Sequence, residues 1–206
     1  MKISYAITVC NELDEIKKLI PFLIENKQPQ DEIVVLIDLK NGTPDVLEYL
    51  GLLEDEIIIV GDQFDGHFGN WKNKLTELCS GEYIFQIDAD EMPHQTLIQN
   101  INDILEMNNV DVVLVPRVNT VEGLTQEHIN KWGWILNESG WVNWPDPQWR
   151  IYRNTEEIRW ENKVHEKLTG YKTISNLPSN PNLALHHPKT IDRQEKQNKY
   201  YNTLMN

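Results

Sequence analysis

The chain has 206 residues, of which 40% are hydrophobic and 25% charged, and its formal net charge is −13. These values are ordinary for a globular protein, and the length suits one large domain. The acidity argues against a nucleic-acid-binding surface, which needs clustered lysine and arginine, and against docking on anionic lipid. An anionic ligand would require a metal ion or a few placed cations to offset the protein's own field.

Two cysteines, Cys10 and Cys79, lie in apolar segments and are predicted to be reduced thiols of a cytoplasmic protein. Residues 1–2 lead directly into a predicted strand, so no signal peptide is expected. No apolar run approaches the roughly 20 residues that a membrane-spanning helix needs.

The first 116 residues alternate short apolar runs with amphipathic segments, which predicts an open, mostly parallel α/β sheet. Pro21 falls inside the first helical pattern and is expected to kink or split it. The predicted strands are residues 3–10, 33–38, 56–60, 83–87 and 111–116, and the predicted helices are residues 13–26, a short helix ending at residue 50, 70–78 and 95–107.

Polar residues follow three of these strands. Asn11 and Glu12 come after the first strand, Asp38 ends the second, and Asp88 and Asp90 follow the fourth. Ligands of open α/β sheets bind beyond the carboxyl ends of the strands, so these side chains are expected in one crevice. Asp88 and Asp90 share one side of the chain, and oxygen ligands suit Mg²⁺ or Mn²⁺. The alternative for so short a pattern is a polar turn.

The second half has a different texture. Residues 117–163 hold six tryptophans with little periodicity, at positions 132, 134, 141, 144, 149 and 160. This pattern predicts a loop-rich segment whose rings suit stacking on sugars, with core packing as the alternative. Extended pieces are expected at residues 151–153, 160–168 and 183–185, and an amphipathic helix at residues 190–204.

Motifs along nearly the whole chain occur in the order found in one family. They are residues 7–12, Asp38, residues 70–75, 81–91, 144–154, 164–166 and 185–187. As an ordered set they resemble GT-A fold glycosyltransferases of family 2, particularly the bacterial and viral branch related to lipopolysaccharide-core glucosyltransferases.

The resemblance implies a single GT-A domain over residues 1–206. Its nucleotide-sugar-binding half would be residues 1–116, its acceptor and catalytic half residues 117–188, and its C-terminal helix residues 189–206. It further implies transfer of a sugar, with inversion, from a nucleoside-diphosphate sugar to a hydroxyl of a glycan or another acceptor. We expect the tryptophan-rich segment and the C-terminal helix to select this acceptor. A UDP-sugar is the favoured donor, with Mn²⁺ or Mg²⁺ bridging the diphosphate.

Matching positions carry the family's site onto this sequence. The residues implied to hold the nucleotide sugar are Thr8, Asn11, Glu12, Asp38, Lys72, Asn73, Asp88 and Arg150. Asp88 and Asp90 match the metal motif, and His186 matches the late histidine that completes the metal site. Arg150 or Arg153 would stabilise charge on the diphosphate.

The chemistry also needs a base for the acceptor hydroxyl. Glu166 stands where the family has its catalytic carboxylate, and Asp146 is the competing residue. Two other functions are alternatives on the same sequence. One is a catalytically inactive nucleotide-sugar-binding module on the same fold. The other is a nucleotidyltransferase, which is disfavoured because the first strand is followed by acidic residues rather than a basic, glycine-rich loop.

Overall fold

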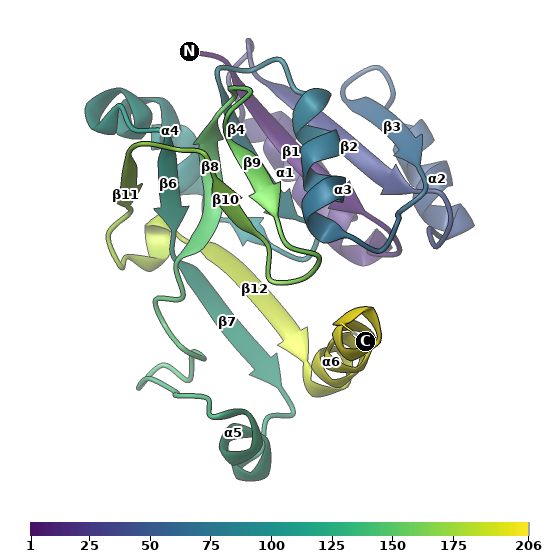
Figure 1. The fold of residues 1–206 in the computed structure, drawn as a ribbon, viewed down its shortest axis with the longest axis vertical. Helices are drawn as coiled ribbons and strands as arrows, with labels where there is room; N and C mark the ends of the chain where they lie inside the picture. The colour runs from purple at the N-terminus through teal and green to yellow at the C-terminus, as the bar shows by residue number, and fades with distance from the viewer. Residues whose placement is uncertain (206) are drawn as a thin grey trace.

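A seven-stranded sheet runs through the computed structural model, which describes residues 1–205 (Figure 1). In spatial order its strands are β11 (Ile174–Asn176), β6 (Val112–Val115), β8 (Gln148–Arg153), β4 (Tyr83–Asp88), β1 (Ile3–Val9), β2 (Glu32–Asp38) and β3 (Ile58–Asp62). Every pairing is parallel except those of β8, which runs antiparallel to β4 and β6 on either side of it. The predicted mostly parallel α/β sheet is therefore confirmed.

Helices and a hairpin bury both faces of this sheet. Helices α1 (Leu13–Asn26), α2 (Pro44–Gly51) and α4 (Gln95–Asn108) pack on one face. The other face is covered by α3 (Phe68–Glu77) and by the antiparallel pair β9 (Arg159–Glu161) and β10 (Lys167–Thr169). Central strands buried on both faces explain why their sequences are continuous apolar runs rather than alternating ones.

Helix α1 continues through Pro21 as one helix, so the split that was one of the two expected outcomes does not occur. Its buried side chains are Ile16, Leu19, Ile20 and Leu23. Burial of each such side chain contributes roughly 1.5–3 kcal/mol, and together they exceed the roughly 3 kcal/mol that an internal proline costs. Packing on the sheet therefore keeps the helix continuous.

A second, three-stranded sheet extends from the main one. It consists of β5 (Met92–Pro93), β12 (Leu185–Thr190) and β7 (Arg117–Glu122). Figure 1 shows β7 and β12 side by side, leading away from the main sheet, with α5 (Gln126–Trp132) beyond β7. The sequence predicted neither β7 nor α5. The short 3₁₀ helix η1 (Pro181–Leu183) precedes β12, and α6 (Ile191–Met205) follows it directly.

Other boundaries differ by small shifts. Strand β3 begins two residues later than predicted, and α3 begins two residues earlier because His67 accepts a hydrogen bond from the backbone of Asn70. The extended piece at residues 160–168 is two paired strands rather than one. Both cysteines are free thiols. None of the helices within residues 1–205 combines the length and apolarity needed to cross a bilayer.

Candidate active site

Two adjoining cavities open near the carboxyl ends of β1, β2 and β4. The larger has a volume of about 770 Å³ and the smaller about 340 Å³. Six side chains line both of them: Lys72, Asp88, Asp90, Glu166, Gln197 and Tyr201. The predicted carboxylates thus lie where one cavity meets the other.

The larger cavity collects the residues predicted to hold a nucleotide from the first two strands. Thr8, Asn11, Glu12 and Asp38 all line it. Burial raises the pKa of Glu12, even though the backbone N–H groups of Cys10 and Asn11 donate to its Oε2 at 2.8 and 3.0 Å. The strand ends therefore present polar groups already held in place by backbone contacts.

Two residues predicted to bind the nucleotide sugar, Asn73 and Arg150, do not line the larger cavity. Asn73 exchanges two hydrogen bonds of 2.8 Å with the backbone of Trp160, which fastens β9 to α3, and it lines neither cavity. Arg150 lines the smaller cavity rather than the larger one. Lys72, next to Asn73, does reach the cavities because it lies on the adjacent face of α3. Arg153, the alternative to Arg150, lies 3.6 Å from Asp111, away from both cavities.

Asp88, at the end of β4, is held by two cations. Arg150 Nη2 lies 2.6 Å from its Oδ2, and Lys72 Nζ lies 3.3 Å from its Oδ1. Burial alone would raise the pKa of Asp88, but the charges of Arg150 and Lys72 outweigh it and hold that pKa well below the usual range. Asp88 is therefore a carboxylate at the junction of the cavities.

Asp90 faces a histidine, but not the predicted one. His187 Nε2 lies 3.2 Å from Asp90 Oδ2, whereas the Nε2 of His186 lies 3.2 Å from the carbonyl oxygen of Pro181 and lines neither cavity. Neighbouring residues of a strand point to opposite faces. His187, which shares its face of β12 with the buried Leu185, therefore faces Asp90, and the predicted His186 does not.

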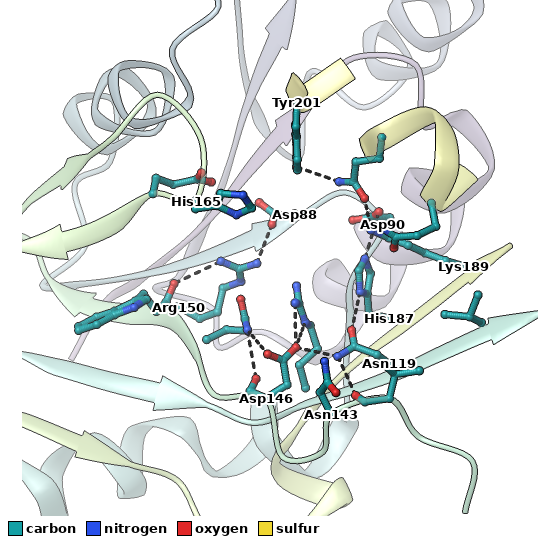
Figure 2. A pocket seen from close by; sticks show the side chains of 18 of the residues that line it. Asp88, Asp90, Asn119, Asn143, Asp146, Arg150, His165, His187, Lys189 and Tyr201 are labelled. Carbon is teal, nitrogen blue, oxygen red and sulfur yellow. Dashed lines mark hydrogen bonds and ion pairs between the residues drawn. The ribbon is translucent and has the colours of Figure 1, made fainter. Parts of the chain in front are cut away.

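A network of hydrogen-bonded side chains connects Asp88 to Asp90, and Figure 2 shows its members Arg150, Asp146, Asn119 and His187 between them. Its centre is Glu91, a fully buried carboxylate that accepts hydrogen bonds from Arg150 at 2.7 and 2.8 Å and from Arg117 at 3.0 Å. In order, the network runs Asp88, Arg150, Glu91, Arg117, Asp146, Asn119, His187 and Asp90. The two carboxylates of the motif are therefore held at the two ends of one series of hydrogen-bonded side chains.

Asn119 orients two members of this network, Asp146 and His187. Its Nδ2 donates to Asp146 at 2.7 Å, and its Oδ1 lies 2.8 Å from Nδ1 of His187. An amide oxygen only accepts, so Nδ1 of His187 donates to Asn119, and Nε2 of the same ring faces Asp90. Asn119, Arg117 and Glu91 were missed from the sequence. The first two lie on the unpredicted strand β7, where alternate positions 117 and 119 share a face.

The two candidate bases differ in their surroundings. Glu166 lines both cavities, and its Oε1 accepts a hydrogen bond from Lys72 Nζ at 2.6 Å. Asp146 lines only the smaller cavity and accepts hydrogen bonds from Arg117, Asn119 and Gln148. Three donors occupy most of the lone pairs of Asp146, which leaves Glu166 the freer acceptor.

Backbone conformation also marks the smaller cavity. Of the five non-glycine residues with positive φ among residues 1–205, three line it: Asn143, Asp146 and His165, with φ of 54°, 41° and 55°. Such positions are sparsely populated and persist where the surrounding structure imposes them, often at binding sites.

Asp90 and His187 fit a divalent ion that is shared with a ligand. Within residues 1–205, no group of three or more His, Cys, Asp or Glu side chains is arranged as a metal cage. Mg²⁺-type sites in contrast use one or two protein ligands together with substrate phosphates and water. A carboxylate and an imidazole 3.2 Å apart supply such a pair, with Asp88 nearby.

Cys10, at the end of the first strand, carries a protonated thiol. Cys10 lines the larger cavity, and burial, with the nearby Glu12 and Asp38 carboxylates, raises its pKa to about 11. The thiol therefore stays protonated near neutral pH and is a poor nucleophile.

Aromatic residues rim the smaller cavity. Trp134, Trp149 and Trp160 line it. Beyond it, Trp132 and Trp134 have ring centroids 4.7 Å apart, and the neighbouring Ile135 is 74% exposed. The tryptophan-rich segment thus contributes both to the cavity and to an exposed surface beside it.

Helix α6 was also missing from the predicted site. Five of its side chains line the larger cavity: Arg193, Lys196, Gln197, Tyr200 and Tyr201. The sequence predicted the helix, but no rule connected its surface with the strand ends of the first half.

Comparison with known proteins gives a family match. The model of glycosyl transferase family 2 matches residues 4–175. The SPbeta prophage-derived glycosyltransferase SunS of Bacillus subtilis (strain 168) is 25% identical over 190 residues, which are 90% of this chain and 39% of the relative. Glycosyltransferase SunS of Bacillus phage SPbeta matches to the same extent. The chain spans about two fifths of the length of these curated relatives.

Solved structures share the fold. The crystal structure of S. aureus TarS 1–349 superposes with a TM-score of 0.64 at 17% identity, covering 91% of this chain and 60% of that one. TarS 1–349 in complex with UDP-GlcNAc gives a TM-score of 0.65 at 17% identity, covering 92% and 59%. At this identity the likeness concerns the fold alone.

Proposed function

The chain belongs to glycosyl transferase family 2 and has its GT-A fold, and from this premise we propose that it transfers a sugar from a nucleoside-diphosphate sugar to an acceptor hydroxyl group. The observation that supports this best is the meeting of two cavities at Asp88, Asp90 and Glu166. The larger cavity would hold the nucleotide of the donor and the smaller one the acceptor. The transferred sugar would lie at their junction.

Glu166 is the proposed base. The acceptor oxygen attacks the anomeric carbon, the bond from that carbon to the diphosphate oxygen breaks, and the proton of the hydroxyl passes to Glu166. Lys72 fixes the position of Glu166 through the 2.6 Å contact. Attack from the acceptor cavity, opposite the departing diphosphate, inverts the anomeric configuration. Asp146 then serves to hold Arg117 and Asn119 in place.

We further propose Asp90 and His187 as the residues that hold Mn²⁺ or Mg²⁺, with Asp88 beside them. When bound, the ion supplies positive charge for the departing diphosphate. Arg150 and Arg117 keep Asp88 and Glu91 oriented around that position through contacts of 2.6 to 3.0 Å.

The test begins with the donor. Nucleotide sugars with different bases are screened by thermal shift with Mn²⁺ or Mg²⁺, starting with UDP-GlcNAc because the fold-sharing TarS was crystallised with it. Release of nucleoside diphosphate from the stabilising donor is then measured with candidate acceptors. Binding without release under any condition would identify an inactive sugar-nucleotide-binding module, and no binding at all would refute the proposal.

Glu166→Gln provides the sharper test. The variant should bind the donor nucleotide as the wild type does, because only the proton acceptor is lost, while transfer falls by about 10²- to 10⁴-fold. Asp146→Asn is the matched control, since it changes the competing carboxylate in the same way. If Asp146→Asn alone abolishes transfer with nucleotide binding intact, Asp146 is the base and the assignment of Glu166 is wrong.

A further inference from the structure

Helix α6 is fixed across the larger cavity by contacts with distant parts of the chain. The ring of Tyr201 meets Phe68 at 5.8 Å and His165 at 5.9 Å, measured between ring centroids. Arg193, in the first turn of the helix, is ion-paired with Glu15 of α1. The helix therefore has a defined orientation against both α1 and α3.

The cavity-lining residues of α6 lie on one face of the helix. Positions 193, 196, 197, 200 and 201 follow the spacing of three, four and seven residues that places side chains in a single stripe. All five line the larger cavity. Lys199, on the same helix, is exposed and lines neither cavity. One face of α6 is thus committed to the cavity and another to solvent.

The charge of the larger cavity does not suit a diphosphate without help. Among the described residues, six carboxylates line it against three cations. The carboxylates are Glu12, Glu15, Asp38, Asp88, Asp90 and Glu166, and the cations are Lys72, Arg193 and Lys196. Two of the three cations therefore come from α6.

These cations differ in how far their charge is already matched. Lys72 is paired with Asp88 and Glu166 at 3.3 and 2.6 Å. Arg193 contacts two carboxylates in the same way. Lys196 has no carboxylate within 4.0 Å among residues 1–205 and lines the larger cavity. It is the cation there whose charge is left for a ligand.

We propose that α6 carries an anion-binding site in which Lys196, with Arg193 beside it, contacts the diphosphate of the donor. This inference rests on the proposed function, because it requires the larger cavity to be the donor site. Lysine binds phosphate as a mobile point charge, and Arg193 adds planar donors next to Asp90, from which it lies 3.6 Å. The helix expected from the sequence to select the acceptor thus also binds the donor.

The test compares Lys196→Gln with Lys199→Gln, which removes the same charge from the solvent face of the same helix. Calorimetry measures the affinity of each variant for UDP in the presence of Mn²⁺, and for GDP, ADP and CDP if UDP does not bind the wild type. Lys196→Gln should weaken nucleoside-diphosphate binding about tenfold, and Lys199→Gln should stay within about twofold of the wild type. Uridine, which lacks phosphates, should bind both variants equally.

Salt dependence provides a second readout. The affinity of the wild type for UDP should fall more steeply with NaCl concentration than that of Lys196→Gln, because one exposed ionic contact is gone. Arg193→Gln should also weaken binding. Lys196 is exposed and has no ion-pair partner in the described chain, so Lys196→Gln should melt like the wild type. The affinity of this variant for UDP therefore tests the anion site even if Arg193→Gln unfolds.

The outcomes separate this inference from the proposed function. Equal UDP affinity in the wild type and Lys196→Gln overturns the anion site on α6 while leaving the transferase proposal intact. An equal loss of uridine and UDP binding overturns the phosphate contact, since the effect would not depend on charge. If the wild type binds no nucleoside diphosphate, both proposals fail together.

Discussion

A single position on β12 decides which histidine joins the candidate site. His186 and His187 are adjacent in the sequence, but strand alternation sends the first toward Pro181 and His94 and the second toward Asp90. Figure 2 shows His187 between Asp90 and Asn119. The motif placed a histidine at this strand, and only the register of the strand could tell which of the two faces the cavity.

Alanine substitution at the two positions should therefore give opposite results. His187→Ala removes a proposed metal-binding nitrogen and should weaken Mn²⁺-dependent UDP binding at least about 10-fold. Loss of a residue that only hydrogen-bonds a metal ligand already costs about 10- to 100-fold in metal affinity. His186→Ala should change it less than about threefold. Both are measured by titrating Mn²⁺ at fixed UDP, with melting temperatures as the control for folding. The reverse order of effects would restore His186 as the site residue.

At the scale of elements, what could be predicted follows burial. Strands β1, β2 and β4 and helices α1 and α4 have strong apolar patterns, and the structure has them close to the predicted bounds. Strand β7 and helix α5 lack such patterns and were not predicted. They lie away from the main sheet, and few of their side chains are buried. Glu91, Arg117 and Asn119 were missed for a related reason. Their roles depend on contacts with residues 26 to 68 positions away.

The start of β2 is tied to its neighbours by one carboxylate. Glu32 accepts hydrogen bonds from Lys2 and Ser4 near β1 and from Ser80 before β4, all at 2.6 or 2.7 Å. Burial alone would raise the pKa of Glu32, but these hydrogen bonds outweigh it and lower the pKa to about 2. Its ionised form therefore links three adjacent elements of the sheet.

This contact predicts a pH dependence of stability. A carboxylate whose pKa is lower in the folded state than its unperturbed value of 4.5 contributes fully above pH 4.5, and the contribution is lost as pH falls toward about 2. Glu32→Gln should lower the free energy of unfolding at pH 6 by on the order of 1 kcal/mol, after allowance for solvent screening. Urea titrations of both proteins at pH 6, 4 and 2.5 check this. A gap between them that does not narrow below pH 4.5 would contradict it.

At the scale of the molecule, the two halves of the sequence share one sheet. Strand β8 comes from residues 148–153 but lies between β4 and β6, which both come from the first 116 residues. Arg150 on β8 reaches Asp88 and Glu91 from that position. The second half of the sequence therefore contributes a central strand and a buried arginine to the half that was predicted to bind the nucleotide sugar.

A fragment of residues 1–116 should consequently fail to fold on its own. It would leave β4 and β6 without their shared partner and Glu91 without either of its arginines, since Arg117 is absent as well. Unpaired strand edges and an uncompensated buried charge favour aggregation over a cooperative native state. Size-exclusion chromatography and near-ultraviolet circular dichroism measure the outcome, with the full chain as reference. A monomeric fragment that melts cooperatively and binds UDP would show that the half is autonomous.

The late insertion of β8 also bears on how the protein is made. While the ribosome synthesises the chain, β1, β2, β3, β4 and β6 emerge well before the strand that must join β4 to β6. Strands β4 and β6 therefore stay unpaired on their facing edges until β8, which ends at Arg153, has left the exit tunnel. During that interval these unpaired strand edges favour mispairing between chains.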